Sequence, residues 1–467
     1  MRTKFPPGPN DRLWGMRLMS EMKSDVLGYY TSLQRDFGDA VSFRTGPYRL
    51  YLFFHPDQVR EALVTNAKST IRLPRVMATF AQWNGNSILI AEGQQWAQQR
   101  KLVQPAFNPR CMENYGRTMV TCARDLIDSW RSDVKRDGFV DRDVDQAMTD
   151  LTLAIICRTM FEADVAEQSA EITQAVSILS SVAFEEMQAP VRLPAWLPTA
   201  HNRRKRWAIE VLDRVVWKFI RDHRHEGGQR GGLLSMLMHS EDPGGPKLDD
   251  QQVRDEAVTL MLAGHDTTAA AFNWLWYCLA RYPDVATRCR EEVEAVIGHR
   301  QPTFSDIANL PVLGATIKET LRLYPPAFAT FLRQATEDLT IGGYEIDKGS
   351  LITVSPFVTQ RDSRWFDQPD RFEVDRFLPP RAGEVPANAF FPFGAGPRAC
   401  IGQLFATTEL TLVAATMLQE CEVGLIPGQA DPQMHVTMAL RPKDRLMLRW
   451  KQTASQQAPG VYKKVLS

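Results

Sequence analysis

The chain of 467 residues lacks an excess of charge of either sign, because 55 lysines and arginines balance 55 aspartates and glutamates. A balanced charge gives no support for binding to nucleic acid or to an anionic membrane surface. The chain also lacks an apolar run of membrane-spanning length, both within and after its proline-rich start at residues 1–10. We therefore expect a soluble, cytoplasmic protein without a transmembrane segment; a shortened form of a membrane-anchored protein is the alternative.

Cysteines are few, and their spacing excludes several kinds of site. There are seven, an odd number, and they are widely separated, which gives no disulfide framework and indicates a reducing compartment. No Cys-x-x-Cys pair, no iron–sulfur spacing and no Gly-x-Gly-x-x-Gly after a strand is present. Zinc, iron–sulfur and flavin or nicotinamide sites are therefore not expected, and no internal repeat is evident.

One cysteine, Cys400, lies at the end of a glycine- and proline-rich stretch, Phe-Pro-Phe-Gly-Ala-Gly-Pro-Arg-Ala-Cys-Ile-Gly, residues 391–402. A helix-forming run follows at residues 403–419. A cysteine at such a junction lies near the positive end of a helix dipole, and Arg398 adds a positive charge, so we expect a lowered thiol pKa. A thiolate here suits a metal ligand or a nucleophile; a buried free cysteine in a turn is the structural alternative.

A second informative stretch is the helical pattern at residues 248–281, which Asp249 or Asp250 can cap. It is apolar on most faces, so we expect it to run through the core. Its centre, Ala-Gly-His-Asp-Thr-Thr at residues 263–268, is a poor helix interior. Threonine hydroxyls can bond to preceding carbonyls, and Gly264 allows a ligand or planar cofactor to approach the backbone. A kinked core helix with a satisfied aspartate is the alternative.

Two side-chain pairs share a helix face. Trp96 and Arg100, four residues apart, present two donors suited to a carboxylate, with a surface cation–π pair as the alternative. Glu319 and Arg322, three residues apart, have a good spacing for an ion pair, with an ordinary exposed pair as the alternative.

The remaining pattern predicts irregular backbone at residues 77–91, a mobile linker at residues 226–250 and a closing hairpin from strands at residues 436–440 and 445–450.

The stretch around Cys400 resembles the haem-binding loop of the cytochrome P450 family. The matching positions are Phe393, Gly396, Arg398, Cys400 and Gly402. The other stretches also resemble motifs of this family, in the same order, over roughly residues 20–450. The resemblance implies a mainly α fold with a small β region (α+β), in one haem domain spanning residues 1–467 with a flexible tail at residues 452–467, and haem b as the cofactor.

The resemblance also implies roles for individual residues. Cys400 would bind the haem iron, Thr267 would hold bound oxygen and Asp266 would relay protons. The residues expected to contact the haem are Trp96, Arg100, Ala263, Gly264, Thr267, Arg333, Phe393, Gly394, Arg398, Cys400 and Gly402. The residues expected to line a substrate pocket are Ile88, Leu89, Ala263, Ala327, Phe328, Ala329, Phe331 and Met438. A buried salt bridge for folding and haem retention is expected from Glu319, Arg322 and Arg376.

The implied activity is that of a monomeric haem-thiolate monooxygenase, which inserts one oxygen atom of O2 into an apolar small molecule. Electrons would come from a separate ferredoxin or flavodoxin with its reductase, for which Arg100 and Lys101 are candidate docking residues. A haem-thiolate isomerase or dehydratase without a reductant, and a non-catalytic haem protein, are the alternatives. The chain departs from many family members at Gln360, where they carry histidine before Arg-Asp.

Overall fold

The computed structural model describes residues 5–10, 15–189, 194, 196–225, 232–238 and 248–453. Most of these residues form helices, and the strands form small sheets, so the predicted α+β class is confirmed. The first four residues of the predicted hinge, residues 226–231 and 239–247 of the predicted linker and the tail from residue 454 lie outside the described residues. No helix of the described part is long and apolar enough to cross a membrane.

Fifteen α-helices are found in the described part of the chain. They are α1 (Met16–Ser24), α2 (Val26–Phe37), α3 (Pro56–Arg60), α4 (Pro74–Asn84), α5 (Gly93–Val103), α6 (Pro109–Asp137), α7 (Val144–Met160), α8 (Ser169–Gln188), α9 (Ala200–His225), α10 (Leu233–Met238), α11 (Asp250–Arg281), α12 (Pro283–Val296), α13 (Pro311–Leu323), α14 (Pro356–Thr359) and α15 (Gln403–Glu420). The strands are β1 (Ala40–Thr45), β2 (Tyr48–Phe53), β3 (Thr70–Arg72), β4 (Val140–Asp143), β5 (Arg333–Ala335), β6 (Leu339–Ile341), β7 (Tyr344–Ile346), β8 (Leu351–Val354), β9 (Cys421–Leu425), β10 (Met434–Val436), β11 (Leu440–Pro442) and β12 (Met447–Gln452).

Helix α11 is the longest element, with 32 residues, and it packs against α7, α9, α13 and α15. It begins with a capping box, in which the Asp249 carboxylate accepts the Gln252 N–H at 2.8 Å and the Gln252 side chain accepts the Asp249 N–H at 3.2 Å. Most of its residues are buried, so the prediction of a core helix is confirmed, and of the two expected caps, Asp249 and Asp250, it is Asp249 that caps it.

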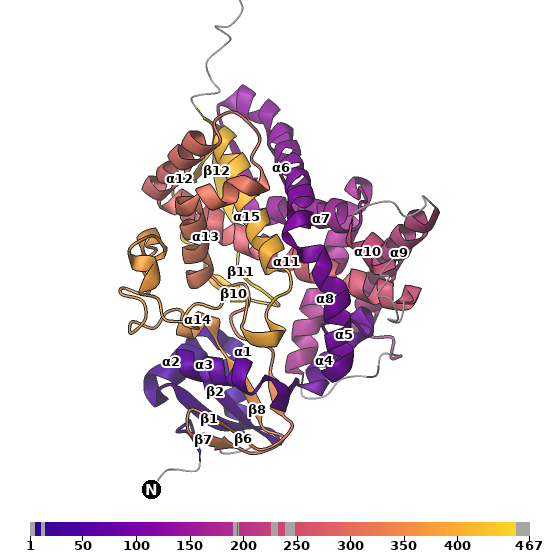
Figure 1. Cartoon of the computed structure of the whole chain (residues 1–467), viewed down its shortest axis with the longest axis vertical. Coiled ribbons are helices and arrows are strands. Elements are labelled where there is room, and N and C mark those ends of the chain that lie inside the picture. The colour runs from indigo at the N-terminus through magenta and orange to yellow at the C-terminus, as the bar shows by residue number, and fades with distance from the viewer. Residues whose placement is uncertain are drawn as a thin grey trace, which may run out of the picture.

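The largest sheet has five strands in the order β1-β2-β8-β5-β3 and lies at one end of the molecule, with α1, α2 and α3 next to it (Figure 1). Strands β2 and β8 are parallel, and the other neighbours are antiparallel. In the β3–β5 pair, Arg72 lies opposite Arg333. The sheet therefore brings two arginines together from segments that are far apart in the sequence.

Two sequence predictions of local structure were wrong. Residues 77–84 are not irregular but belong to α4, which starts at Pro74 and buries Val76, Phe80 and Trp83 at helical spacing. The predicted closing hairpin does not form, because β10 pairs with β11, whereas β12 pairs with β4 and β9. Trp450 of β12 packs against Trp130 of α6, with ring centroids 5.3 Å apart, which favours that separate pairing.

Candidate active site

The loop at residues 391–402, called the cysteine loop from here on, is held mainly by its own backbone. The Cys400 N–H donates to the Phe393 carbonyl at 2.9 Å, and the Ala399 N–H donates to the Gly396 carbonyl at 3.0 Å. The Gly394 N–H donates to the Phe391 carbonyl at 2.9 Å. The loop thus closes on itself, and Cys400 is placed directly before the N-terminus of α15.

Gly396 connects the cysteine loop to the rest of the protein through a close backbone approach. It has φ of +71°, and a Cβ atom there would lie 2.2 Å from the Leu63 carbonyl oxygen. A side chain has no room at this point, and the left-handed backbone also favours glycine. Gly394 shares the left-handed conformation, with φ of +72°, but a Cβ atom there would meet its nearest neighbour, the Ala399 Cα atom, only at 4.0 Å. Gly402 lies beside the thiol, because a Cβ atom there would be 3.9 Å from Cys400 Sγ.

Cys400 differs from every other cysteine in its surroundings. The other six are buried, whereas Cys400 is exposed. Burial nevertheless raises the pKa of its thiol above the usual value, with the Gly402 N–H and Arg100 opposing that shift. The Cys400 side chain thus has accessible surface and is at the same time desolvated by the residues around it. The expected lowering of the thiol pKa was wrong in the protein alone, because desolvation outweighs the helix terminus and the nearby cation.

The middle of α11 also has accessible surface. Ala263 and Thr267 are exposed and lie four residues apart, whereas the other residues between Val253 and Ala280 are buried or half-buried. The Thr267 hydroxyl donates to the Ala263 carbonyl at 2.7 Å, which is the back-bonding expected from the sequence. Gly264 allows α11 to lie close to α7, since a Cβ atom there would lie 2.8 Å from the Ile156 side chain. Its role toward a cofactor stays a prediction.

Asp266 is held by an arginine from a distant strand. Arg441 of β11 donates to the Asp266 carboxylate at 2.7 Å and also pairs with Asp145. The neighbouring His265 is buried and lies 3.0 Å from the Thr152 hydroxyl, and burial lowers the pKa of this histidine to about 4. His265 is therefore a neutral core residue near pH 7, whereas the Asp266 carboxylate is paired with a cation.

Four arginines gather around one carboxylate on the β3–β5 side of the site. They are Arg72, Arg100, Arg333 and Arg398, and the carboxylate is Glu92, which pairs with Arg398. Burial, followed by repulsion from Arg72, lowers the pKa of Arg333 and of Arg398 to about 10. Within the described residues, Arg333 has no carboxylate within ion-pair distance. The cluster thus has a surplus of positive charge, which a bound dianion would offset.

Sequence reasoning found Arg100, Arg333 and Arg398 but missed Arg72 and Glu92. Arg72 could have been suspected as the last residue of a short strand, but its partner strand begins 261 positions later, which no local pattern reveals. Trp96 does contact the cluster, because the Arg398 guanidinium carbon lies 4.0 Å from the centre of its ring. Arg100 donates to the Ala399 carbonyl at 3.1 Å, beside Cys400.

These residues fit the haem b implied by the sequence. The group brings an iron ion, for which the desolvated thiol of Cys400 is a soft ligand, and two propionate carboxylates, for which the arginine cluster supplies the unpaired cations. Phe393, partly buried against the core, lies in the same loop as the thiol. The thiol and the arginine cluster therefore match the iron and the propionates of the cofactor, respectively.

The expected pocket residues only partly share one location. Ile88 is buried in the main core, and five others pack against that core, namely Leu89, Phe328, Ala329, Phe331 and Met438. Ala263 and Ala327 are exposed. Phe331 meets Phe80 of α4 edge to face, with centroids 5.5 Å apart. Phe80 was missed because residues 77–84 were expected to be irregular. The pocket roles stay predictions.

The expected ion pair between α13 and a later loop is present. Arg322 donates to both oxygens of Glu319, at 2.7 and 2.8 Å, and Arg376 donates to one of them at 3.1 Å. All three side chains are buried, so removing one would leave an uncompensated charge. Gln360 donates to the Arg322 carbonyl at 3.1 Å and accepts the Phe391 N–H at 2.9 Å. Glutamine at this position thus ties α13 to the start of the cysteine loop.

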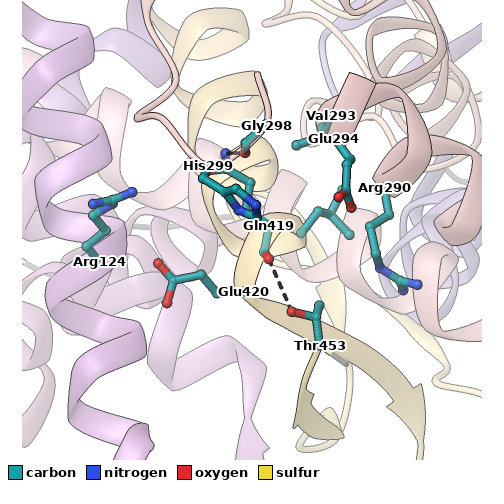
Figure 2. A pocket seen from close by; sticks show the side chains of 10 residues that line it. Arg124, Arg290, Val293, Glu294, Gly298, His299, Gln419, Glu420 and Thr453 are labelled. Atoms are coloured by element: carbon teal, nitrogen blue, oxygen red, sulfur yellow. Dashed lines mark hydrogen bonds between the residues drawn. The ribbon is translucent and has the colours of Figure 1, made fainter. Parts of the chain in front are cut away.

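A second pocket, where α6, α12 and α15 meet, has a different charge balance (Figure 2). Arg124 and Arg290 lie on opposite sides of it, and two carboxylates, Glu294 and Glu420, share its lining (Figure 2). Its acidic and basic side chains balance, in contrast to the arginine cluster, so we assign no ligand to it.

Comparison with known proteins agrees with this site. The profile of the family described as "Cytochrome P450" matches residues 6–450. The chain is 35% identical to cyclooctatin synthase of Streptomyces melanosporofaciens, over 86% of this chain and 87% of that protein. It is 33% identical to cyclooctat-9-en-7-ol 5-monooxygenase of the same organism, over 84% of each chain. It is 32% identical to pentalenene oxygenase of Streptomyces avermitilis, over 92% of this chain and 93% of that protein.

Proposed function

The chain belongs to the cytochrome P450 family and is a haem b-dependent monooxygenase, and from this premise we propose that its substrate is a cyclic terpene hydrocarbon or an alcohol derived from one. One oxygen atom of O2 enters a C–H or C=C bond of the substrate, and the other leaves as water with two protons and two electrons. Two relatives, pentalenene oxygenase and cyclooctat-9-en-7-ol 5-monooxygenase, support this substrate class through their names.

The observation that carries the oxygenation chemistry is the desolvated, accessible thiol of Cys400, together with the exposed Thr267 on a mostly buried helix. The substrate class rests on the names of the relatives. A bound haem supplies the activation of O2 and the transfer of one oxygen atom. Cys400 would hold its iron, and Arg333 and Arg100 would hold its propionates. The apolar side chains of Ile88 and Phe331 would orient a hydrocarbon and exclude water from it.

Two residues of α11 would handle protons. The Thr267 hydroxyl, which donates to the Ala263 carbonyl at 2.7 Å, can rotate to donate into the site. The Asp266 carboxylate would pass protons toward it from outside the site. Because Asp266 is paired with Arg441 at 2.7 Å, we expect proton transfer to require a loosening of that pair.

Electrons would come from a separate ferredoxin or flavodoxin and its reductase, since the sequence has neither a dinucleotide-binding fingerprint nor an iron–sulfur spacing. Lys101 and Arg100 lie on α5, and Arg100 touches Ala399 of the cysteine loop. A cationic docking surface at this point would place an acidic partner near the thiol.

The test uses the haem-loaded full chain with a surrogate ferredoxin, its reductase and NADPH, and offers pentalenene and a fatty acid as alternative substrates. Incorporation of one labelled atom from 18O2 into the terpene supports the proposal. Oxygenation of the fatty acid alone contradicts the substrate class. Rearrangement of a peroxide without NADPH would instead favour an isomerase or dehydratase.

A further inference from the structure

The residues that follow α4, residues 85–90, include the expected pocket residues Ile88 and Leu89 and form neither helix nor strand. We call them the wall segment. Within it, the Ile90 N–H donates to the Ser87 carbonyl at 2.8 Å, which closes one short turn. Several of its other backbone groups, at residues 86, 88 and 89, are bonded to side chains of α11, β3 and α5, so distant parts of the chain help to set its shape.

Glu256 of α11 makes the most buried of these contacts. Its Oε1 accepts the Ile88 N–H at 2.9 Å, and the residue is only 1% exposed. Its other oxygen, Oε2, is buried and has no hydrogen-bond partner among the described residues. Burying a carboxyl group with an unpaired oxygen is unfavourable, so the bond to Ile88 is the favourable contact that the structure provides in return.

Two neighbours on α11 extend this contact along the wall segment. The Asp255 carboxylate accepts the Asn86 N–H at 2.8 Å, and the Thr259 hydroxyl donates to the Ser87 hydroxyl at 2.6 Å. Asp255 and Thr259 are four residues apart and therefore lie on one face of the helix. This face of α11 is thus bonded to two consecutive residues of the wall segment, Asn86 and Ser87.

Arg72 holds the same segment at its carbonyl groups. It donates to the Leu89 carbonyl at 2.6 Å and approaches the Ile88 carbonyl at 3.5 Å. Gln99 of α5 donates to the Asn86 carbonyl at 2.5 Å. The peptide groups around Ile88 are therefore held between a carboxyl group of α11 and a guanidinium of β3, which also belongs to the arginine cluster.

We propose that Glu256 is a positioning residue for the substrate pocket: by accepting the Ile88 N–H it fixes the Ile88–Leu89 wall and so limits the size of substrate that the pocket admits. The inference rests on the proposed function, because it takes this wall to face the substrate. Burial, with Asp255 adding to the effect and the Ile88 N–H opposing it, raises the pKa of Glu256 to about 8. A carboxyl group that is neutral near pH 7 still accepts through its carbonyl oxygen, and an amide can do the same.

The experiment compares E256A and E256Q with the wild type as haem-loaded full-length proteins. Hydrogen exchange of the Ile88 amide should be about tenfold faster in E256A, because one buried hydrogen bond is lost. The E256Q variant should restore exchange to within about threefold of the wild type, because its side-chain oxygen still accepts the bond. E256M separates this role from space filling, because methionine keeps the length of the side chain but removes the oxygen that accepts the Ile88 N–H. Faster exchange of the Ile88 amide in E256M supports the hydrogen bond, and wild-type exchange there would show a purely space-filling role.

A second readout is the ratio of affinities for 4-phenylimidazole and imidazole, measured from the shift of the haem absorbance band. Imidazole is too small to reach the wall, so E256A should change this ratio by about tenfold and E256Q by less than about threefold. The matched control is E409Q, since Glu409 is an equally buried carboxyl on α15 with no contact to the wall segment. It should leave both readouts at wild-type values.

Wild-type exchange of Ile88 in E256A, or an equal change in E409Q, overturns the inference. If E256A does not fold, T259V replaces it, because valine keeps the shape and removes the bond to Ser87. Faster hydrogen exchange of the amides of residues 86–88 in T259V supports the inference that α11 positions the wall segment. Unchanged exchange of these amides overturns that inference. Failure of the proposed function is distinguishable, since it leaves these exchange rates and ligand ratios in place while terpenes give no oxygenated product.

Discussion

The cysteine loop and the wall segment both contribute to the site, but different contacts hold them. The cysteine loop is closed by backbone bonds among residues at most seven positions apart, such as that from the Cys400 N–H to the Phe393 carbonyl. The wall segment is held by side chains of α11, β3 and α5, and Glu256 is 168 positions away from Ile88. The first is a locally encoded shape and the second is a shape imposed by the fold.

This difference has a consequence for mutation. A loop that closes on itself depends mainly on its own residues, with outside contacts such as those of Gln360 and Arg100 adding to them. A segment held by distant side chains can be altered one partner at a time, so its shape can be tuned without loss of the fold. The loop that would bind the iron is therefore shaped mainly by its own residues, and the segment expected to meet the substrate is shaped by distant partners.

The largest effect is expected from C400S. Serine is a poor ligand for haem iron, so oxygenation should be abolished and the long-wavelength absorbance band of the reduced, carbon monoxide-bound protein should disappear. The control is C289S, because Cys289 already lies 3.3 Å from the Thr316 hydroxyl and a serine hydroxyl can keep that contact. Retention of the band in C400S would show that the cysteine loop does not bind the iron.

The next largest effect is expected from G396A in the cysteine loop. A Cβ atom would meet the Leu63 carbonyl at 2.2 Å at φ of +71°, and backbone cannot move aside as a side chain can. We expect a loss of about 2–4 kcal/mol in unfolding free energy, together with weaker haem retention. Denaturant unfolding and haem content measure both. G424A, where nothing lies within 4 Å, should behave as the wild type.

A smaller effect is expected from the equivalent change in the wall segment, G85A. A Cβ atom there would lie 2.0 Å from the Asp255 carboxylate, at φ of +52°, but this obstacle is a side chain that can shift. We expect a loss of about 1–2 kcal/mol in stability. We also expect faster exchange of the Asn86 amide, with haem content unchanged. If G85A lost haem as G396A does, the contrast between the two regions would be broken.

The smallest effect is a pH dependence from Glu256. Its pKa rises from 4.5 to about 8 on folding, so between these values the folded protein keeps a proton that the unfolded chain releases. Stability from this group is fully present below the unfolded pKa and is lost as the pH rises through the folded one. Between about pH 6 and 7 the wild type should lose about 1 kcal/mol relative to E256Q. If the unfolding free energies of the two proteins changed equally with pH over this range, the prediction would be contradicted.

Sequence reasoning reached the α+β class, the core helix capped by Asp249 and the cysteine loop, because each depends on short-range patterns: periodicity, a capping residue and glycines at turns. It failed for α4, where an amphipathic spacing was overlooked, and for β12, whose partners are set by packing against α6. It also gave a thiol pKa of the wrong direction, since desolvation depends on everything folded around Cys400.

By itself the sequence determined the family and the haem chemistry, because the residues around Cys400 adopt their shape through constraints carried by that short stretch. The tertiary structure alone decided several long-range meetings of charged and polar groups that no sequence pattern indicated. It placed Arg72 opposite Arg333, paired Asp266 with Arg441 across 175 positions and set Glu256 against Ile88. Such pairings follow from how helices and strands pack, and the interactions of buried polar groups depend on neighbours in space rather than along the chain.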